Sequence, residues 1–131
     1  MAFLPYSYDD GQPRPWEYLP CGAITPKVGM ALVESSGNLA IAAGTNKPTY
    51  ISMVDKASAC TAGDIIPVIR VDHGIVFETT FSADPTGINV GDKVTLHASS
   101  GLQVTATTTG GVAEVVYKDA NASGAMCRVR F

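Results

Sequence analysis

The chain has 131 residues, a length that fits one compact domain and can bury a useful hydrophobic core. Nine basic residues against twelve acidic ones give a formal net charge of −3, and their scattered distribution excludes the basic patch that nucleic acid or an anionic membrane would require. No apolar run approaches the length of a membrane span and residues 1–10 lack the features of a signal peptide, so we expect a soluble protein made in the cytoplasm.

Residues 1–21 differ in composition from the rest of the chain. Four prolines occur between positions 5 and 20, and five aromatic residues are interleaved with them. So many prolines exclude a helix and disfavour a central strand, which predicts an extended N-terminal arm. Such an arm cannot bury its own rings. The rings must therefore lie either on the domain's own core or on a partner molecule, and the composition leaves both alternatives open.

From residue 22 onward, short apolar runs are separated by glycine, asparagine and serine at intervals of about ten residues, a spacing typical of all-β proteins. We therefore predict a single small antiparallel β domain over residues 22–131, built as a β-barrel, a β-tulip-like fold or a sandwich. At most one helical turn is expected, at residues 55–59. Apart from a central hairpin, the predicted strands are residues 23–25, 30–34, 38–42, 49–53, 93–97, 102–106, 113–117 and 126–131.

The central hairpin is predicted within residues 62–81. Two runs rich in isoleucine, valine and phenylalanine flank the sequence Asp72-His73-Gly74, and glycine suits a tight reversal because it adopts positive φ without strain. We therefore expect residues 65–69 to pair antiparallel with residues 75–80.

The last predicted strand alternates cleanly between apolar and polar positions. Its odd-numbered residues from Cys127 to Phe131 share one face, and its even-numbered residues from Met126 to Arg130 share the other. This pattern predicts that one face of the sheet covers a core and that the end of the chain is docked in the sheet.

Few residues suggest catalysis or metal binding. Cys21, Cys60 and Cys127 are far apart and show no C-x-x-C pairing, which favours three reduced, buried thiols over a zinc site or a disulfide framework. His73 lies in the predicted turn and His97 ends a predicted strand, so the two histidines do not form a common site. We expect no catalytic residue, no metal and no cofactor.

Five segments of the chain resemble a known family. They are VGMALVESSGNLA at residues 28–40, KPTYISM at 47–53, AGDIIPV at 62–68, IVFET at 75–79 and VGDKVTL at 90–96. Together they are similar to the small β-rich decoration, or cement, proteins of tailed-bacteriophage heads. The resemblance extends over the predicted β domain as a general pattern and contains no sharp motif.

This resemblance implies a β-barrel or β-tulip-like domain that binds the outside of an expanded icosahedral shell as a homotrimer. It would stabilise the shell by bridging subunits of the major capsid protein, with the N-terminal arm as a main contact. The protein would then lie on the outer surface of the virion after synthesis in the host cytoplasm. Within the arm we assign the partner contact to the aromatic residues and two prolines: Phe3, Tyr6, Tyr8, Pro13, Pro15, Trp16 and Tyr18.

Two other classes of function are weaker expectations. A ligand-recognition β domain, such as a carbohydrate-binding module or a phage fibre or tail component, would expose flat aromatic rings on a sheet face, whereas most aromatic residues here lie in the predicted arm. An enzyme ranks third. Glu34, Glu78 or Glu114 could join an aspartate in a glycosidase pair, but nothing in the sequence selects one.

Overall fold

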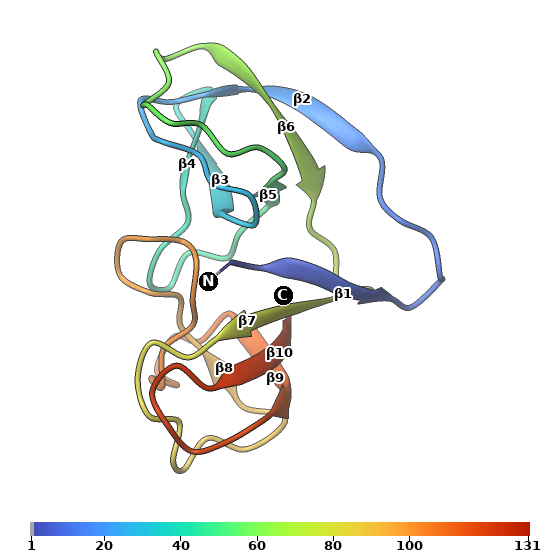
Figure 1. Cartoon of the computed structure of the whole chain (residues 1–131), viewed down its shortest axis with the longest axis vertical. Helices are drawn as coiled ribbons and strands as arrows, with labels where there is room; N and C mark the ends of the chain where they lie inside the picture. The colour runs from blue at the N-terminus through green and yellow to red at the C-terminus, as the bar shows by residue number, and fades with distance from the viewer. Residues whose placement is uncertain (1) are drawn as a thin grey trace.

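Residues 2–131 are described by a computed structural model, and they form ten β-strands and no helix (Figure 1). The prediction of an all-β fold is confirmed. The helical turn expected at residues 55–59 does not form. Within residues 2–131 no helix has the length and apolar character that crossing a bilayer requires.

The strands form two five-stranded sheets that lie one above the other in Figure 1. The open sheet has the order β1 (Leu4–Tyr8), β7 (Ile75–Thr80), β10 (Met126–Arg130), β9 (Ala113–Lys118) and β8 (Lys93–Val94). The other sheet, called the ring here, closes in the order β2 (Trp16–Cys21), β4 (Asn38–Ile41), β3 (Ala31–Ser35), β5 (Tyr50–Ser52) and β6 (Asp64–Arg70). All strand pairs are antiparallel except β2 and β4, which meet through Cys21 and Leu39.

Most strands lie where the apolar runs predicted them. The predicted strands that became β3, β4, β5, β9 and β10 agree with the structure to within one residue at each end. The run at 93–97 forms a strand only at its first two residues, and the run at 102–106 contributes isolated bridges through Val104. The run at 23–25 forms no strand, and the Ile24 N–H instead closes a tight turn onto the carbonyl of Gly22 at 2.8 Å.

The central hairpin predicted across Asp72-His73-Gly74 is wrong. β6 belongs to the ring, where it pairs with β2 and β5, and β7 belongs to the open sheet, where it pairs with β1 and β10. A turn does form, because the Gly74 N–H donates to the Asp72 carboxylate at 2.8 Å. The turn redirects the chain from one sheet to the other, because other strands occupy both edges of β6 and of β7.

The extended N-terminal arm is also not found. β1 begins at Leu4 and runs antiparallel to β7, and β2 runs antiparallel to β6 along its whole length. Residues 4–21 and 64–80 therefore make one long two-stranded ribbon that passes through both sheets. Three of the four prolines fit this arrangement: Pro5 lies on an edge strand, where a missing N–H is tolerated, and Pro13 and Pro15 lie in the connection between β1 and β2.

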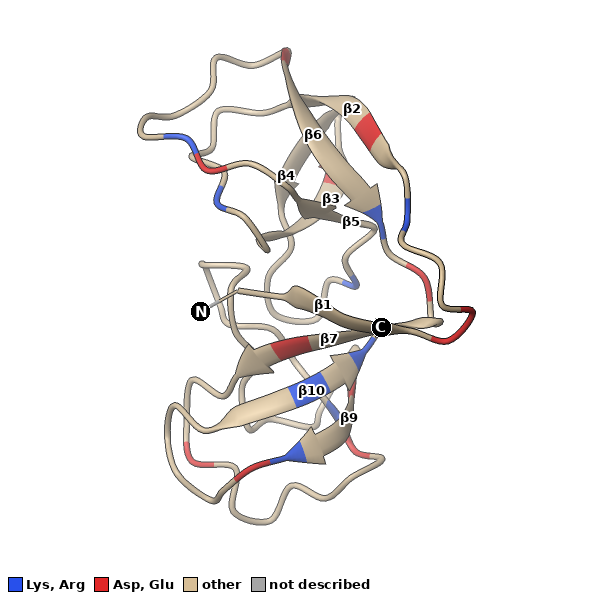
Figure 2. Ribbon diagram, turned by 45° about the vertical axis from the view of Figure 1, so that its right-hand side comes forward, with Lys and Arg blue, Asp and Glu red and all other residues tan. Residues whose placement is uncertain are grey.

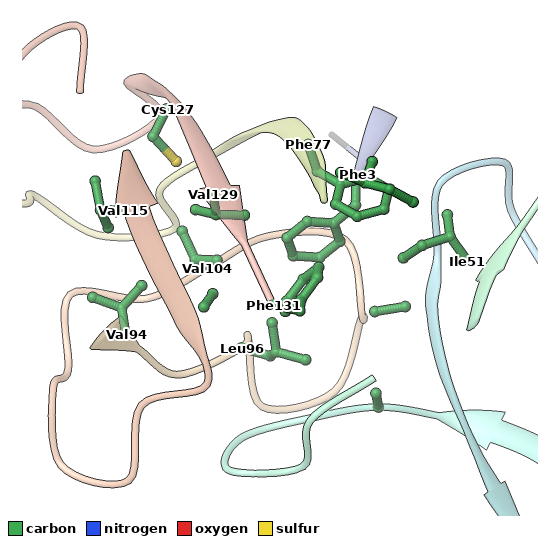
Figure 3. Close-up of a cluster of buried hydrophobic side chains, with 14 of the residues drawn as sticks. Phe3, Ile51, Phe77, Val94, Leu96, Val104, Val115, Cys127, Val129 and Phe131 are labelled. Carbon is green, nitrogen blue, oxygen red and sulfur yellow. The ribbon is translucent and has the colours of Figure 1, made fainter. Parts of the chain in front are cut away.

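The larger hydrophobic core joins the two sheets. Phe3, Phe77 and Phe131 pack together from the residue before β1, from β7 and from the residue after β10, with ring centroids 5.3 Å apart for Phe3 and Phe131 and 5.6 Å apart for Phe77 and Phe131. Figure 3 shows these three rings grouped together, with Ile51 of the ring beside them. A smaller core that includes Leu39 fills the ring itself.

The start of β1 is fixed by a close backbone approach at Gly29. The Phe3 N–H donates to the Gly29 carbonyl at 2.7 Å, and the Gly29 N–H donates to the Ser52 carbonyl at 2.8 Å. Gly29 has φ of +80°, and a Cβ on this residue would lie 2.5 Å from the Ala2 Cβ. Glycine is needed here because any side chain would push the beginning of the ribbon off the domain.

We predict that Phe3→Ala lowers the free energy of unfolding by about 3–5 kcal/mol, because the ring is fully buried and its removal leaves a cavity between the sheets. Urea denaturation at neutral pH measures this change. Leu4→Ala is the matched control, since the half-exposed neighbouring side chain should cost less than about 1 kcal/mol. Equal stability losses in the two variants would contradict the docking of β1.

Candidate functional site

The seven predicted contact residues do not share one surface. Phe3 is 0% exposed and belongs to the core, so its assignment to a partner contact is corrected. Tyr8 is half-buried against the same core, with the Arg14 guanidinium 5.3 Å from its ring centroid. Pro13 and Pro15 are exposed in the connection between β1 and β2. The remaining three residues, Tyr6, Trp16 and Tyr18, are exposed on strand faces.

Two of these aromatic side chains form an apolar patch on the outer face of the closed sheet, the ring. Trp16 and Tyr18 alternate along β2 and are 54% and 64% exposed. On the neighbouring strand β6, Pro67 lies opposite Tyr18, and Ile65, which is also exposed, lies opposite Pro20. Residues opposite one another on paired strands point to the same side of a sheet. These five residues, Trp16, Tyr18, Pro20, Ile65 and Pro67, are called the ring patch below.

Tyr6 belongs to a different surface, the outer face of the open sheet. The Arg128 guanidinium lies between two tyrosines, with its central carbon 3.8 Å from the Tyr6 ring centroid and 4.6 Å from that of Tyr117. The Arg128 Nε donates to the Glu78 carboxylate at 3.2 Å, which fixes the guanidinium between the rings. We call Tyr6, Arg128 and Tyr117 the tyrosine–arginine stack.

Sequence reasoning missed Tyr117. The register between β10 and β9 shifts where Val116 is inserted, and this bulge places Tyr117 opposite Arg128. Arg128 had been placed correctly on the polar face of the last strand. The signal in the sequence was the outward-facing Arg128, because an arginine on the outer face of a sheet can stack on exposed tyrosines of neighbouring strands.

Two arginines fix the corner where the ribbon crosses between the sheets. Arg14, in the connection between β1 and β2, donates to both oxygens of Asp72 at 2.6 and 3.1 Å. Arg130 at the end of β10 donates to both oxygens of Asp9 at 2.8 and 2.9 Å and to the His73 carbonyl at 2.8 Å. Bidentate pairs of this kind fix the orientation of both partners. The two connections between the sheets are thereby held side by side.

The electrostatics of this corner follow from the same pairs. The hydrogen bond from Arg14 holds the pKa of Asp72 below its usual range, and the hydrogen bond from Arg130 does the same for the pKa of Asp9. The pKa of Arg14 is raised by its hydrogen bond to Asp72. All these groups are therefore charged at neutral pH.

A groove adjoins the corner on the side of the chain end. It consists of two hollows of about 350 and 190 Å³ that share Lys47, His73 and Phe131 as lining residues. Figure 2 shows blue, basic segments together with red, acidic ones in this region between the end of β6 and the C-terminus. The first hollow is also lined by Pro48, Thr49, Arg70, Val71 and Asp72, and the second by Lys93, Gly111, Val112, Glu114 and Arg130.

The histidines and cysteines have structural surroundings. His73 Nδ1 lies 3.1 Å from the main-chain oxygen of Phe131, and His97 Nδ1 accepts hydrogen bonds from the N–H groups of Ser99 and Ser100. In the part of the chain that the structure describes, no group of three or more His, Cys, Asp or Glu side chains is placed to hold a metal ion.

The three thiols are buried and unpaired, which agrees with the expectation from the sequence. Burial raises the pKa of the Cys127 thiol to about 12, and burial together with a hydrogen bond involving Cys60 raises the pKa of Cys21 to about 11. The Cys21 and Cys127 thiols therefore stay protonated at neutral pH and are poor nucleophiles.

Comparison with known proteins yields no relative for this chain: no protein-family model matches it, and no curated protein matches it significantly.

The corner predicts a specific loss of stability in acid. The lowered pKa of folded Asp72 contributes stability that is present above the unfolded pKa of about 3.9 and is lost as the pH falls through the folded value. Asp72→Asn should therefore lower the free energy of unfolding at pH 7 by about 1 kcal/mol or less, because the carboxylate is partly solvated. The variant should also show a flatter loss of stability below pH ~4.

Urea denaturation at a series of pH values measures this difference. Asp119→Asn is the matched control, because its exposed carboxylate accepts a hydrogen bond from the Tyr117 hydroxyl instead of pairing with an arginine. Parallel stability curves for wild type and Asp72→Asn would contradict the role of the Arg14 pair.

Proposed function

We propose that this protein is a structural virion protein that decorates the outside of a tailed-bacteriophage capsid and stabilises the shell by bridging major capsid subunits, as a homotrimer. The observation that carries the proposal is the exposure of large apolar side chains on a rigid scaffold. Trp16, Tyr18 and Ile65 are each more than half exposed, although their backbones are paired within the ring. Apolar groups clustered in this way on a folded surface are typical of a protein interface.

The contact is assigned to the ring patch and no longer to a free arm. A tryptophan and a tyrosine that are already fixed on a strand lose little conformational entropy when a partner covers them. Aromatic residues with this property are frequent among the residues that dominate binding energy at interfaces. The resemblance to decoration proteins seen in the sequence and the small strands of the all-β fold observed here both support this proposal.

Many copies strengthen such a contact. A decoration protein meets a repeated lattice, so a trimer engages several capsid subunits at once and the second and third contacts form at high effective concentration. A modest interface in each copy is then sufficient to hold the shell against internal pressure. The proposed location is accordingly the outer surface of the virion.

We predict that Trp16→Ala/Tyr18→Ala weakens binding to expanded shells at least about 30-fold, equivalent to about 2 kcal/mol, because it removes the two largest side chains of the ring patch. Co-sedimentation with shells assembled from the major capsid protein of the same genome measures the affinity. Electron microscopy of the particles locates the bound protein.

Val90→Ala is the matched control, because Val90 is an exposed apolar residue outside the ring patch. Circular dichroism and urea denaturation establish that each variant is folded. A folded double variant that binds shells as wild type does would overturn the assignment to the ring patch, and wild-type protein that does not bind shells would overturn the proposed function.

A second candidate function is recognition of a ligand with flat apolar faces, such as a sugar. It is favoured by the tyrosine–arginine stack, whose tyrosines are 54% and 38% exposed on a sheet face. A hollow of about 160 Å³ adjoins the stack, since its lining includes Glu78, the carboxylate that holds Arg128. Aromatic rings beside a carboxylate supply both stacking surfaces and hydrogen-bond acceptors.

The second candidate predicts binding to one or more members of a glycan panel, with an affinity that Tyr117→Ala lowers at least about tenfold, or ~1.4 kcal/mol. Tyr117→Phe keeps the ring and serves as the control. Binding that is absent, or equal in both variants, would exclude the stack as a sugar-binding platform.

A further inference from the structure

The lining of the groove beside the corner contains more basic than acidic side chains, whereas the rest of the chain contains more acidic than basic ones. Four of the nine lysine and arginine residues line it, but only two of the twelve aspartate and glutamate residues do, in a chain whose formal charge is −3. The excess is therefore local and opposite in sign to the charge of the whole protein. A region of this kind attracts negatively charged partners.

The four cations differ in their availability. Arg70 is paired with Glu17 at 2.9 Å, and Arg130 is paired with Asp9. Lys47 and Lys93 are exposed, and among residues 2–131 neither amine has a hydrogen bond or an ion pair. An amine on a flexible stem without a partner can turn toward a ligand carboxylate without breaking an existing contact.

The groove also has apolar walls and a fixed shape. Phe131, Val71 and Val112 are apolar lining residues, and Phe131 lines both hollows. Gly111 lies so close to β8 that a Cβ on it would stand 2.1 Å from the Lys93 carbonyl oxygen. The backbones of Gly111 and Lys93 are therefore in close contact at this side of the groove. His73, which lines both hollows, is held by its contact with the Phe131 main-chain oxygen.

We propose that the groove binds an acidic peptide segment in extended conformation, with its carboxylates at Lys47 and Lys93 and an apolar side chain on the floor between them. This binding site is separate from the ring patch and does not depend on whether the protein decorates a capsid. A short peptide fits better than a nucleic acid, because it can place separate carboxylates at Lys47 and Lys93 and keep them away from Asp72 and Glu114, whereas a continuous phosphate backbone requires an extended basic stripe.

The test uses the full chain and a short blocked peptide of aspartate and glutamate residues around one phenylalanine. Binding is followed by backbone amide chemical shifts at low salt. We expect shifts around the groove, a loss of affinity of about tenfold in Lys47→Gln/Lys93→Gln, and weakening with salt as the Debye length shortens from about 30 Å at 0.01 M to about 8 Å at 0.15 M. The same peptide with asparagine and glutamine in place of its acids should not bind.

Lys27→Gln/Lys56→Gln is the control, because it changes the net charge by the same amount outside the groove. Equal losses in the two double variants would show a general charge effect and overturn the proposal, as would the absence of peptide binding at low salt. A single-stranded oligonucleotide that displaces the peptide and binds more tightly would reassign the groove to nucleic acid. Failure of shell binding with peptide binding intact would reject the proposed function alone.

Discussion

The whole fold depends on the pairing of residues 4–21 with residues 64–80. This ribbon contributes two neighbouring strands to the open sheet and two to the ring, so it is the element that both sheets share. Each sheet alone has few and short strands, and β8 and β5 have only two and three residues. Small sheets gain stability by burying a common face. The core around Phe3, Phe77 and Phe131 is that common face.

The crossing point needs directional contacts because the backbone ladder is interrupted there. Seven residues connect β1 to β2 in one half of the ribbon, and four residues connect β6 to β7 in the other half. Hydrophobic packing is non-directional and would not fix how these unequal connections meet. The bidentate pairs of Arg14 with Asp72 and of Arg130 with Asp9 provide fixed geometry at this point. They also fix His73 and the neighbouring groove.

How much of the fold could be predicted from the sequence depends on whether each sequence pattern reports on local or on long-range structure. Alternation between apolar and polar residues is local, and it located β3, β4, β9 and β10 accurately. Strand pairing is not local. The turn at Asp72-His73-Gly74 suits a hairpin and a change of sheet equally well, so only the available partners decide between them. One partner of each strand, β2 for β6 and β1 for β7, is an N-terminal strand that the prolines had argued against.

The candidate surfaces could be predicted from the sequence less completely than the strands. Composition identified Trp16 and Tyr18 as rings that their own segment could not bury, and both remain exposed. Composition could not distinguish them from Phe3, because Phe3 is buried by core residues that come from distant segments of the chain. Tyr117 and Lys93 were not predicted, since their significance arises from contacts and hollows formed by distant segments.

The sheet edges indicate how partners are recognised. The ring is closed and has no free edge, and the open sheet ends at β1 and β8. β1 contains Pro5, which has no N–H to offer, and a register shift follows that residue. β8 has two residues and exposes Lys93. Short, charged or bulged edges disfavour the addition of a partner strand. Recognition by this fold therefore depends on side chains displayed on its faces and in its groove, and these side chains are held in place by the ribbon that the N-terminal residues complete.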